Sequence, residues 1–171
     1  MNYSFVLMGV SGSGKSALAP LLASRLGAAV LDGDFLHPRA NINKMSSGTP
    51  LEDSDRAPWL LALNDAIYAM ARTNKISLII CSALKKSYRQ TLRKGNENVY
   101  FLFLDAPYDV ILTRLEARRG HFQKAGMLKS QFATLERPGK EEPYVITLDA
   151  SLGLEEVAQN AQAAIARLIE G

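Results

Sequence analysis

A glycine-rich segment near the start of the chain constrains its fold more than any other feature. The segment fits the pattern G-x-x-x-x-G-K-[ST] at every position and reads Gly9-Val10-Ser11-Gly12-Ser13-Gly14-Lys15-Ser16. An apolar run precedes it and an amphipathic stretch follows, so we expect a strand, a tight loop and then a helix. In that setting the backbone N–H groups of the loop and the start of the helix point at phosphate oxygens. The sequence therefore predicts a phosphate-binding loop.

Two side chains of this loop have roles that follow from the same chemistry. Lys15 is expected to reach the β and γ phosphates of a nucleotide, and the Ser16 hydroxyl is expected to ligate Mg²⁺. The loop alone leaves the class of protein open, because switches, motors and kinases share it. The run Asn74-Lys75-Ile76-Ser77 ends in serine where a guanine-reading carboxylate would stand, which argues against a GTPase. At 171 residues the chain is also too short for ring or transporter ATPases, so a small-molecule kinase is favoured.

Short apolar runs alternate with amphipathic stretches along the chain. Strands are predicted at residues 3–8, 28–32, 76–81, 99–104 and 144–148, and helices near 15–26, 55–73, 85–94, 107–119, 127–136 and 154–169. This alternation predicts an α/β protein in three layers, with a central five-stranded parallel sheet between helices. At roughly 150 residues per domain, we expect residues 1–171 to form a single domain. Residues 33–54 and 120–126 interrupt the pattern, and we assign them to a substrate-binding insert of about 33–75 and a small lid of about 114–136.

The charge balance and the single cysteine bear on the class of partner and on the compartment. Lys and Arg total 20 against 17 Asp and Glu, and a net charge of +3 is too small to predict a nucleic-acid partner. Cys81 has no second cysteine to pair with, and its apolar neighbours indicate a buried, reduced thiol. The sequence shows neither an export signal nor a membrane-spanning run. We therefore expect a cytoplasmic protein that binds no membrane.

Two carboxylates stand at the end of the second predicted strand, in Asp32-Gly33-Asp34. In an extended segment residues i and i+2 point to the same side, so both can face one site. Asp32 is predicted to hold Mg²⁺ through water, and Asp34 to accept the proton of a substrate hydroxyl or to orient that hydroxyl. A solvated acidic turn is the alternative that the intervening glycine leaves open. Asp105 ends the fourth strand and resembles a metal carboxylate, but a turn or capping role is favoured for it.

Polar side chains that suit a polyhydroxylated anion follow the second and third strands. We predict substrate binding by Asp34, His37, Arg39, Lys44, Arg56, Ser82, Lys85 and Arg89. Lys85 and Arg89 are four residues apart on one face of a helix, where they could meet a substrate carboxylate. Each of these cations is also compatible with a solvated surface. In the same region Asp55 is predicted to cap a helix, and Trp59 is predicted to lie in the core.

Three arginines, Arg114, Arg118 and Arg119, precede the second interruption of the pattern. An arginine that reaches the γ phosphate during transfer accelerates the reaction by about 10³- to 10⁵-fold. We assign this role to Arg118, although spacing alone does not distinguish among the three. Solvent exposure is the favoured interpretation for Arg119.

Taken together, these residues resemble the gluconokinases, small P-loop kinases related to shikimate and adenylate kinases. The matching segments run in the family's order from residue 8 to residue 136. They are Met8 to Ser16, Asp32-Gly33-Asp34, His37-Pro38, Asn41-Ile42, Lys44-Met45, Asp55-Arg56, Pro58-Trp59, Cys81 to Lys86, Gly120-His121-Phe122, Ser130-Gln131-Phe132 and Leu135-Glu136. The resemblance implies a homodimeric cytosolic enzyme that uses ATP and Mg²⁺ to phosphorylate the 6-hydroxyl of D-gluconate.

The resemblance also implies roles for single residues. Asp34 would orient the attacking hydroxyl, Lys15 and an arginine such as Arg118 would neutralise the phosphoryl group, and Ser16 would hold Mg²⁺. Arg114 would flank adenine together with the loop at residues 149–152. Gln123-Lys124 departs from the Met-Pro of many relatives, which leaves the contacts of the lid open.

Two other functions remain open at this point. One is a kinase of another sugar acid, of a shikimate-like polyol acid or of a nucleoside monophosphate. The other is a nucleotide-dependent binding module that has lost transfer activity. The presence of Asp34 argues against the module, because loss of the catalytic carboxylate is the feature expected there.

Overall fold

The computed structural model describes residues 1–118 and 122–171. Its centre is a sheet formed by β1 (Tyr3–Met8), β2 (Ala29–Asp32), β3 (Ile76–Ile80), β4 (Val99–Asp105) and β5 (Val145–Asp149). All the strand pairings are parallel, and the spatial order is β2-β3-β1-β4-β5. The predicted five-stranded parallel sheet is confirmed, and every strand end lies within one residue of its predicted position.

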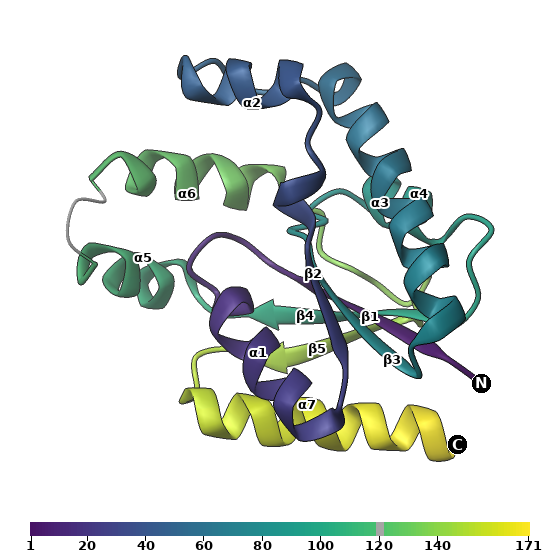
Figure 1. The fold of residues 1–171 in the computed structure, drawn as a ribbon. Coiled ribbons are helices and arrows are strands. Elements are labelled where there is room, and N and C mark those ends of the chain that lie inside the picture. Colours follow the sequence, from purple (N-terminus) through teal and green to yellow (C-terminus); the bar gives the residue numbers. More distant parts are fainter. Residues whose placement is uncertain (119–121) are drawn as a thin grey trace.

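Helices cover both faces of the sheet (Figure 1). α1 (Lys15–Leu26) and α7 (Leu154–Glu170) pack on one face, and α3 (Asp53–Thr73) and α4 (Lys86–Arg93) pack on the other. Alternate residues of β1 separate the two cores: Phe5 and Leu7 face α1 and α7, whereas Val6 and Met8 face α3 and α4. All four side chains are fully buried, because β1 is the central strand and helices cover both faces of the sheet there. The core therefore fixes β1, and with it the start of the phosphate loop.

The remaining elements gather at the carboxyl end of the sheet (Figure 1). They are the 3₁₀ helix η1 (Gly33–Leu36) and the helices α2 (Arg39–Ser46), α5 (Tyr108–Glu116) and α6 (Phe122–Thr134). η1, α2 and α3 occupy the predicted insert, and α6 occupies most of the predicted lid. α6 begins five residues before its predicted start at residue 127. Arg119, for which solvent exposure is predicted, and Gly120 and His121 of the predicted lid lie outside the described residues.

The start of α3 differs from the prediction. The helix begins at Asp53 after the N-cap residue Glu52, so the prediction that Asp55 caps it is wrong. Asp55 is instead the third helical residue, and its carboxylate accepts the backbone N–H of Glu52 at 2.8 Å. This is the returning half of a capping box, which satisfies a donor that the helix itself leaves unpaired. The prediction for Trp59 is confirmed, since only 7% of its surface is exposed.

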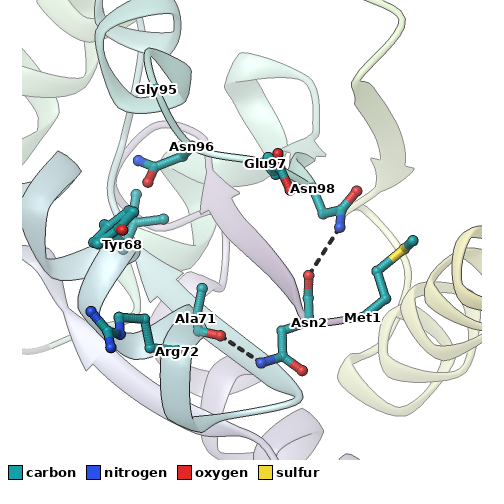
Figure 2. Close-up of a pocket in the computed structure, with 10 residues that line it drawn as sticks. Met1, Asn2, Tyr68, Ala71, Arg72, Gly95, Asn96, Glu97 and Asn98 are labelled. Atoms are coloured by element: carbon teal, nitrogen blue, oxygen red, sulfur yellow. Dashed lines mark hydrogen bonds between the residues drawn. The ribbon is translucent and has the colours of Figure 1, made fainter.

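A cavity of about 460 Å³ lies at the opposite end of the sheet, where β1 begins (Figure 2). Asn2 donates a hydrogen bond to the carbonyl oxygen of Ala71 at 2.5 Å, and Asn98 donates to the carbonyl oxygen of Asn2 at 3.2 Å. These amides fasten the start of β1 to α3 and to the turn before β4. The cavity is remote from the phosphate loop, so its polar groups belong to the fold and not to a nucleotide site.

Arg89 is the largest fully buried side chain in the described part of the protein. Its guanidinium pairs with both oxygens of Glu142, at 2.8 and 2.9 Å. It also donates to the carbonyl oxygens of Ala83 and Glu136, each at 2.8 Å. The prediction that Arg89 binds substrate is therefore wrong: on α4 it points into the protein, where it joins the segment after β3 to the segment after α6.

We expect Glu142→Gln to destabilise the fold by about 3–5 kcal/mol, because it leaves the buried Arg89 charge without its counter-ion. The neighbouring Glu141→Gln is the matched control, since Glu141 forms a solvent-exposed pair with Lys86 at 3.8 Å and its loss should cost less than about 1 kcal/mol. Urea unfolding of both variants measures the difference. Equal unfolding midpoints for the two variants would show that the buried pair does not hold the fold.

Candidate active site

The phosphate loop has the strained backbone that its glycines predict. Gly9 and Gly12 have φ angles of 145° and 82°, a region that side chains other than hydrogen disfavour. A Cβ atom at Gly9 would lie 2.9 Å from the carbonyl oxygen of Leu104, and one at Gly12 would lie 2.9 Å from the Leu115 side chain. The loop is thus pressed against β4 and α5, and only glycine fits at these two positions.

Lys15 lies folded back over the loop. Its Nζ donates hydrogen bonds to the carbonyl oxygens of Gly9 and Val10, at 2.6 and 3.0 Å. Burial lowers the pKa of Lys15 to about 8, although the negative charges nearby oppose the shift. The ammonium group is therefore held by neutral carbonyls in a poorly solvated place, where an incoming phosphate would stabilise its charge.

A cavity of about 270 Å³ opens beside the loop and collects most of the predicted catalytic residues. Its lining comprises Ser11, Gly12, Gly14, Lys15, Ser16, Ala17, Asp32, Asp34, Ile80, Ser82, Leu115 and Arg118. The structure thus brings together the predicted phosphate, metal and proton-accepting groups. They come from the carboxyl ends of β1, β2 and β3 and from the end of α5, which is the ligand-binding edge of such a sheet.

The two carboxylates face this cavity through a turn and not through an extended strand. Asp32 ends β2 and accepts the backbone N–H of Asp34, which lies in η1, at 3.0 Å. A Cβ atom at Gly33 would come within 2.6 Å of the carbonyl oxygen of Ile80, so the turn packs tightly on β3. Burial, together with the charge of Asp32, raises the pKa of Asp34, as expected of a group that takes up a proton.

An aromatic pair supports this turn from the side of α3. The Trp59 indole N–H donates to the carbonyl oxygen of Gly33 at 2.8 Å. The His37 ring stacks on Trp59 with centroids 4.2 Å apart and planes 14° apart. Asn41 lies 3.1 Å from Nδ1 of His37 and donates to the carbonyl oxygen of Asp55 at 2.9 Å. Burial lowers the pKa of His37, so the ring favours its neutral form. The sequence analysis assigned no contact to Asn41.

Three of the predicted substrate cations are already paired with acidic residues of α3. Lys44 contacts Asp55 at 2.6 Å, while Lys85 contacts Asp53 at 3.0 Å and Arg56 lies 4.0 Å from it. The Tyr88 hydroxyl also donates to Asp53, and these bonds hold the pKa of Asp53 below its usual value. Arg56 and Asp53 are three residues apart on α3, whereas the pairs of Lys44 and Lys85 join segments whose proximity the sequence does not show.

The other predicted residues are placed as follows. Arg39 is exposed in the first turn of α2. Asp105 forms an ion pair with Arg137 at 2.9 Å, so neither the turn nor the capping role favoured for it describes its side chain. Cys81 is buried, and this burial raises its pKa to about 12, which makes it an inert thiol.

A second cavity at the phosphate loop, of about 220 Å³, extends toward α7. It shares Gly12, Gly14 and Arg118 with the first cavity, and Leu104, Arg114 and Leu152 also line it. The Arg114 guanidinium donates to the carbonyl oxygen of Leu152 at 3.4 Å. Arg114 and the loop after β5 thus line a largely apolar cavity next to the phosphate loop, a lining that suits a nucleobase.

Known proteins share both the sequence and this arrangement. Residues 5–138 match a family described as an AAA domain. The chain is 60% identical over 156 residues to the thermoresistant gluconokinase of Escherichia coli, which covers 91% of this chain and 89% of that protein. It is 48% identical over 162 residues to the thermosensitive gluconokinase of the same organism, covering 95% and 87%. The crystal structure of a gluconokinase from Sinorhizobium meliloti matches with a TM-score of 0.86 and 40% identity, over 98% of this chain and 94% of that one.

The lowered pKa of Lys15 leads to a test of phosphate binding. At a pH of about 9 the free lysine, with its pKa of about 8, is mostly neutral, and a bound phosphate raises that pKa. We therefore expect ATP binding at this pH to take up a proton, measured by titration calorimetry in two buffers of different ionisation enthalpy. Lys15→Arg is the control, because its guanidinium stays charged throughout. Equal proton uptake by both proteins would contradict this account.

Proposed function

The chain belongs to the gluconokinases, and on that premise we propose that it transfers the γ phosphate of ATP to the 6-hydroxyl of D-gluconate, giving 6-phospho-D-gluconate. One observation carries the proposal: Lys15, Asp34 and Arg118 line a single cavity beside a complete phosphate loop. The cavity thus offers a phosphate cation, a proton acceptor and a second cation to one bound substrate pair. These are the groups that phosphoryl transfer to an alcohol requires.

In the proposed mechanism, N–H groups at the end of the loop and the start of α1 bind the phosphates, and Lys15 neutralises the β and γ groups. Asp34 accepts the proton of the attacking hydroxyl, a role that its raised pKa suits. Arg118 faces both cavities, so it can reach the phosphoryl group during transfer. Arg114 flanks adenine in the second cavity.

The cavity also fits a magnesium ion bound mainly by phosphates and water. Ser16 and Asp32 supply a hydroxyl and a carboxylate to it, the hard oxygen ligands that Mg²⁺ prefers. Within the described residues no group of three or more His, Cys, Asp or Glu side chains is arranged to hold a metal. When bound, Mg²⁺ would neutralise charge on the β and γ oxygens. Ser16 would hold it directly and Asp32 through water.

For the acceptor, we propose His37, Arg39, Lys44, Arg56, Ser82 and Lys85 as the contacts of gluconate, with residues 33–75 as the substrate insert and 114–136 as the lid. Support comes from the position of Ser82 in the phosphate cavity and of Arg56 and Lys85 around Asp53. A substrate carboxylate can replace that of Asp53, because these pairs are partly exposed and contribute little to stability. Other sugar acids and nucleoside monophosphates are less favoured, since the similar proteins are gluconokinases.

We further propose a homodimer in the cytoplasm. Leu61 and Tyr68 on α3 leave 61% and 55% of their surface exposed, which supports an association surface there. The buried reduced thiol of Cys81 suits a reducing compartment. Among the described residues, none of the helices has the length and apolar character needed to cross a bilayer.

The first test of the reaction is Lys15→Ala. Loss of the loop cation proposed to neutralise the β and γ phosphates should lower gluconate-dependent ADP formation at least about 100-fold while the protein stays folded. Lys129→Ala, on the exposed side of α6, is the control and should keep full activity. Shikimate, AMP and an assay without acceptor run alongside. Unchanged turnover in Lys15→Ala, or preference for another acceptor, would contradict the proposal.

The pH dependence tests Asp34. Because burial and Asp32 raise its pKa above 3.8, activity should fall on the acid side of the profile as Asp34 becomes protonated, at a pH above 3.8. Asp32→Asn removes the repelling charge, so the same fall in kcat should move to lower pH, even though the maximum rate drops. Asp34→Asn should lower kcat by about 10²- to 10⁴-fold. An acid limb that stays in place in Asp32→Asn would show that Asp34 does not control it.

A further inference from the structure

One side chain of α6, that of Gln131, forms two hydrogen bonds to the phosphate loop. The Gln131 Oε1 atom accepts the backbone N–H of Ser11 at 2.7 Å, and its Nε2 atom donates to the Ser11 hydroxyl at 3.0 Å. The two residues are 120 positions apart in the chain. Figure 1 shows α6 beside the loop that joins β1 to α1. The oxygen and the nitrogen of the Gln131 amide thus both hydrogen-bond to one loop residue, Ser11.

Packing fixes the side of α6 that carries Gln131. Leu128, three residues earlier, is fully buried in the core. Phe132 meets the ring of Tyr108 on α5 edge to face, with centroids 5.4 Å apart. Leu128 lies three residues before Gln131 and four before Phe132, so its neighbours on the helix surface are both held. A rotation of α6 would therefore break these contacts and pull Gln131 off the loop.

The amide is well matched to its position. Ser11 lines the phosphate cavity together with Lys15 and Arg118. A phosphate oxygen can only accept hydrogen bonds, whereas the amide both accepts and donates, so it holds Ser11 without adding charge beside the phosphates. A glutamate at the same position would lose the donor and place a negative charge at the edge of the cavity.

We propose that Gln131 is a positioning residue that couples α6 to the phosphate loop, so that nucleotide phosphates bound by the loop also order α6 for transfer. This inference rests on the proposed kinase reaction. Lys15 and the other loop donors bind ATP without Gln131, because its contact is with Ser11 alone. The loss of the amide should therefore act on kcat more than on the affinity for ATP.

The kinetic test compares Gln131→Ala with Ser130→Ala, the exposed neighbouring position on α6. Removal of two hydrogen bonds should lower kcat about tenfold, with the KM for ATP within about threefold of the parent. Ser130→Ala should match the parent protein. Ser11→Ala keeps the N–H and loses only the hydroxyl, so the Ser11→Ala, Gln131→Ala double variant should be no slower than Gln131→Ala. Multiplied losses in the double variant would overturn the coupling.

A second measurement needs no acceptor, so it separates this inference from the identity of the substrate. Amide hydrogen exchange is followed in residues 126–134 with and without a non-hydrolysable ATP analogue. In the parent and in Ser130→Ala the analogue should slow exchange in this part of α6, and in Gln131→Ala it should not, although the analogue still binds. Equal protection in all three proteins would overturn the proposal even if gluconate is the substrate. Absence of gluconate turnover by the parent would instead count against the proposed function.

Discussion

The buried pair of Arg89 and Glu142 is the interaction on which the site side of the fold depends. A charge without solvent needs a partner and hydrogen bonds for its remaining donors, and here the backbone supplies them. One bond goes to Ala83, whose φ of 47° is unusual for a residue with a side chain and costs about 1–2 kcal/mol. Arg89 thus fixes a strained turn between Ser82 and Lys85. Through Glu136 it also fixes the end of the segment that carries α6.

The residues proposed to bind the acceptor are held in place differently from those around the phosphates. Around the phosphates, glycine backbone and buried groups give a rigid shape, as Gly9 and Gly33 illustrate through contacts that leave no room for a Cβ atom. Around the acceptor, Lys44 and Lys85 lie in partly exposed pairs with Asp55 and Asp53. Such pairs hold long side chains in place at little free-energy cost, and a ligand of the same charge as the aspartates can displace them. The site is therefore preorganised for the nucleotide and exchangeable for the acid.

The features that the sequence predicts correctly are local in the chain, and those that it misses join distant segments. The strands, the phosphate loop and the Asp32 and Asp34 pair follow from patterns a few residues long, and the structure brings the last two together in one cavity. The prediction for Arg89 was wrong because its spacing of four residues from Lys85 suggested that both cations lie on one exposed face of a helix. α4 is short and polar on average, and the sequence does not contain the information that Glu142 arrives from beyond α6 to bury it. The hydrogen bonds between Gln131 and Ser11 also join segments that are far apart in the chain, and no local pattern predicts them.

Burial shifts the pKa values of Lys15 and Asp34, the two central ionisable groups of the site, in opposite directions. It lowers the pKa of Lys15 to about 8 and raises that of Asp34, so in each case it disfavours the charged form. Without ligand, both charged forms therefore carry a desolvation cost and are less favoured than they would be in water. A phosphate anion near Lys15 recovers part of that cost, since it replaces neutral carbonyl partners with a full negative charge. In the proposed reaction, Asp34 would recover its part by taking the proton of the acceptor hydroxyl. The same desolvation therefore favours phosphate binding beside Lys15 and, in the proposed reaction, proton transfer to Asp34.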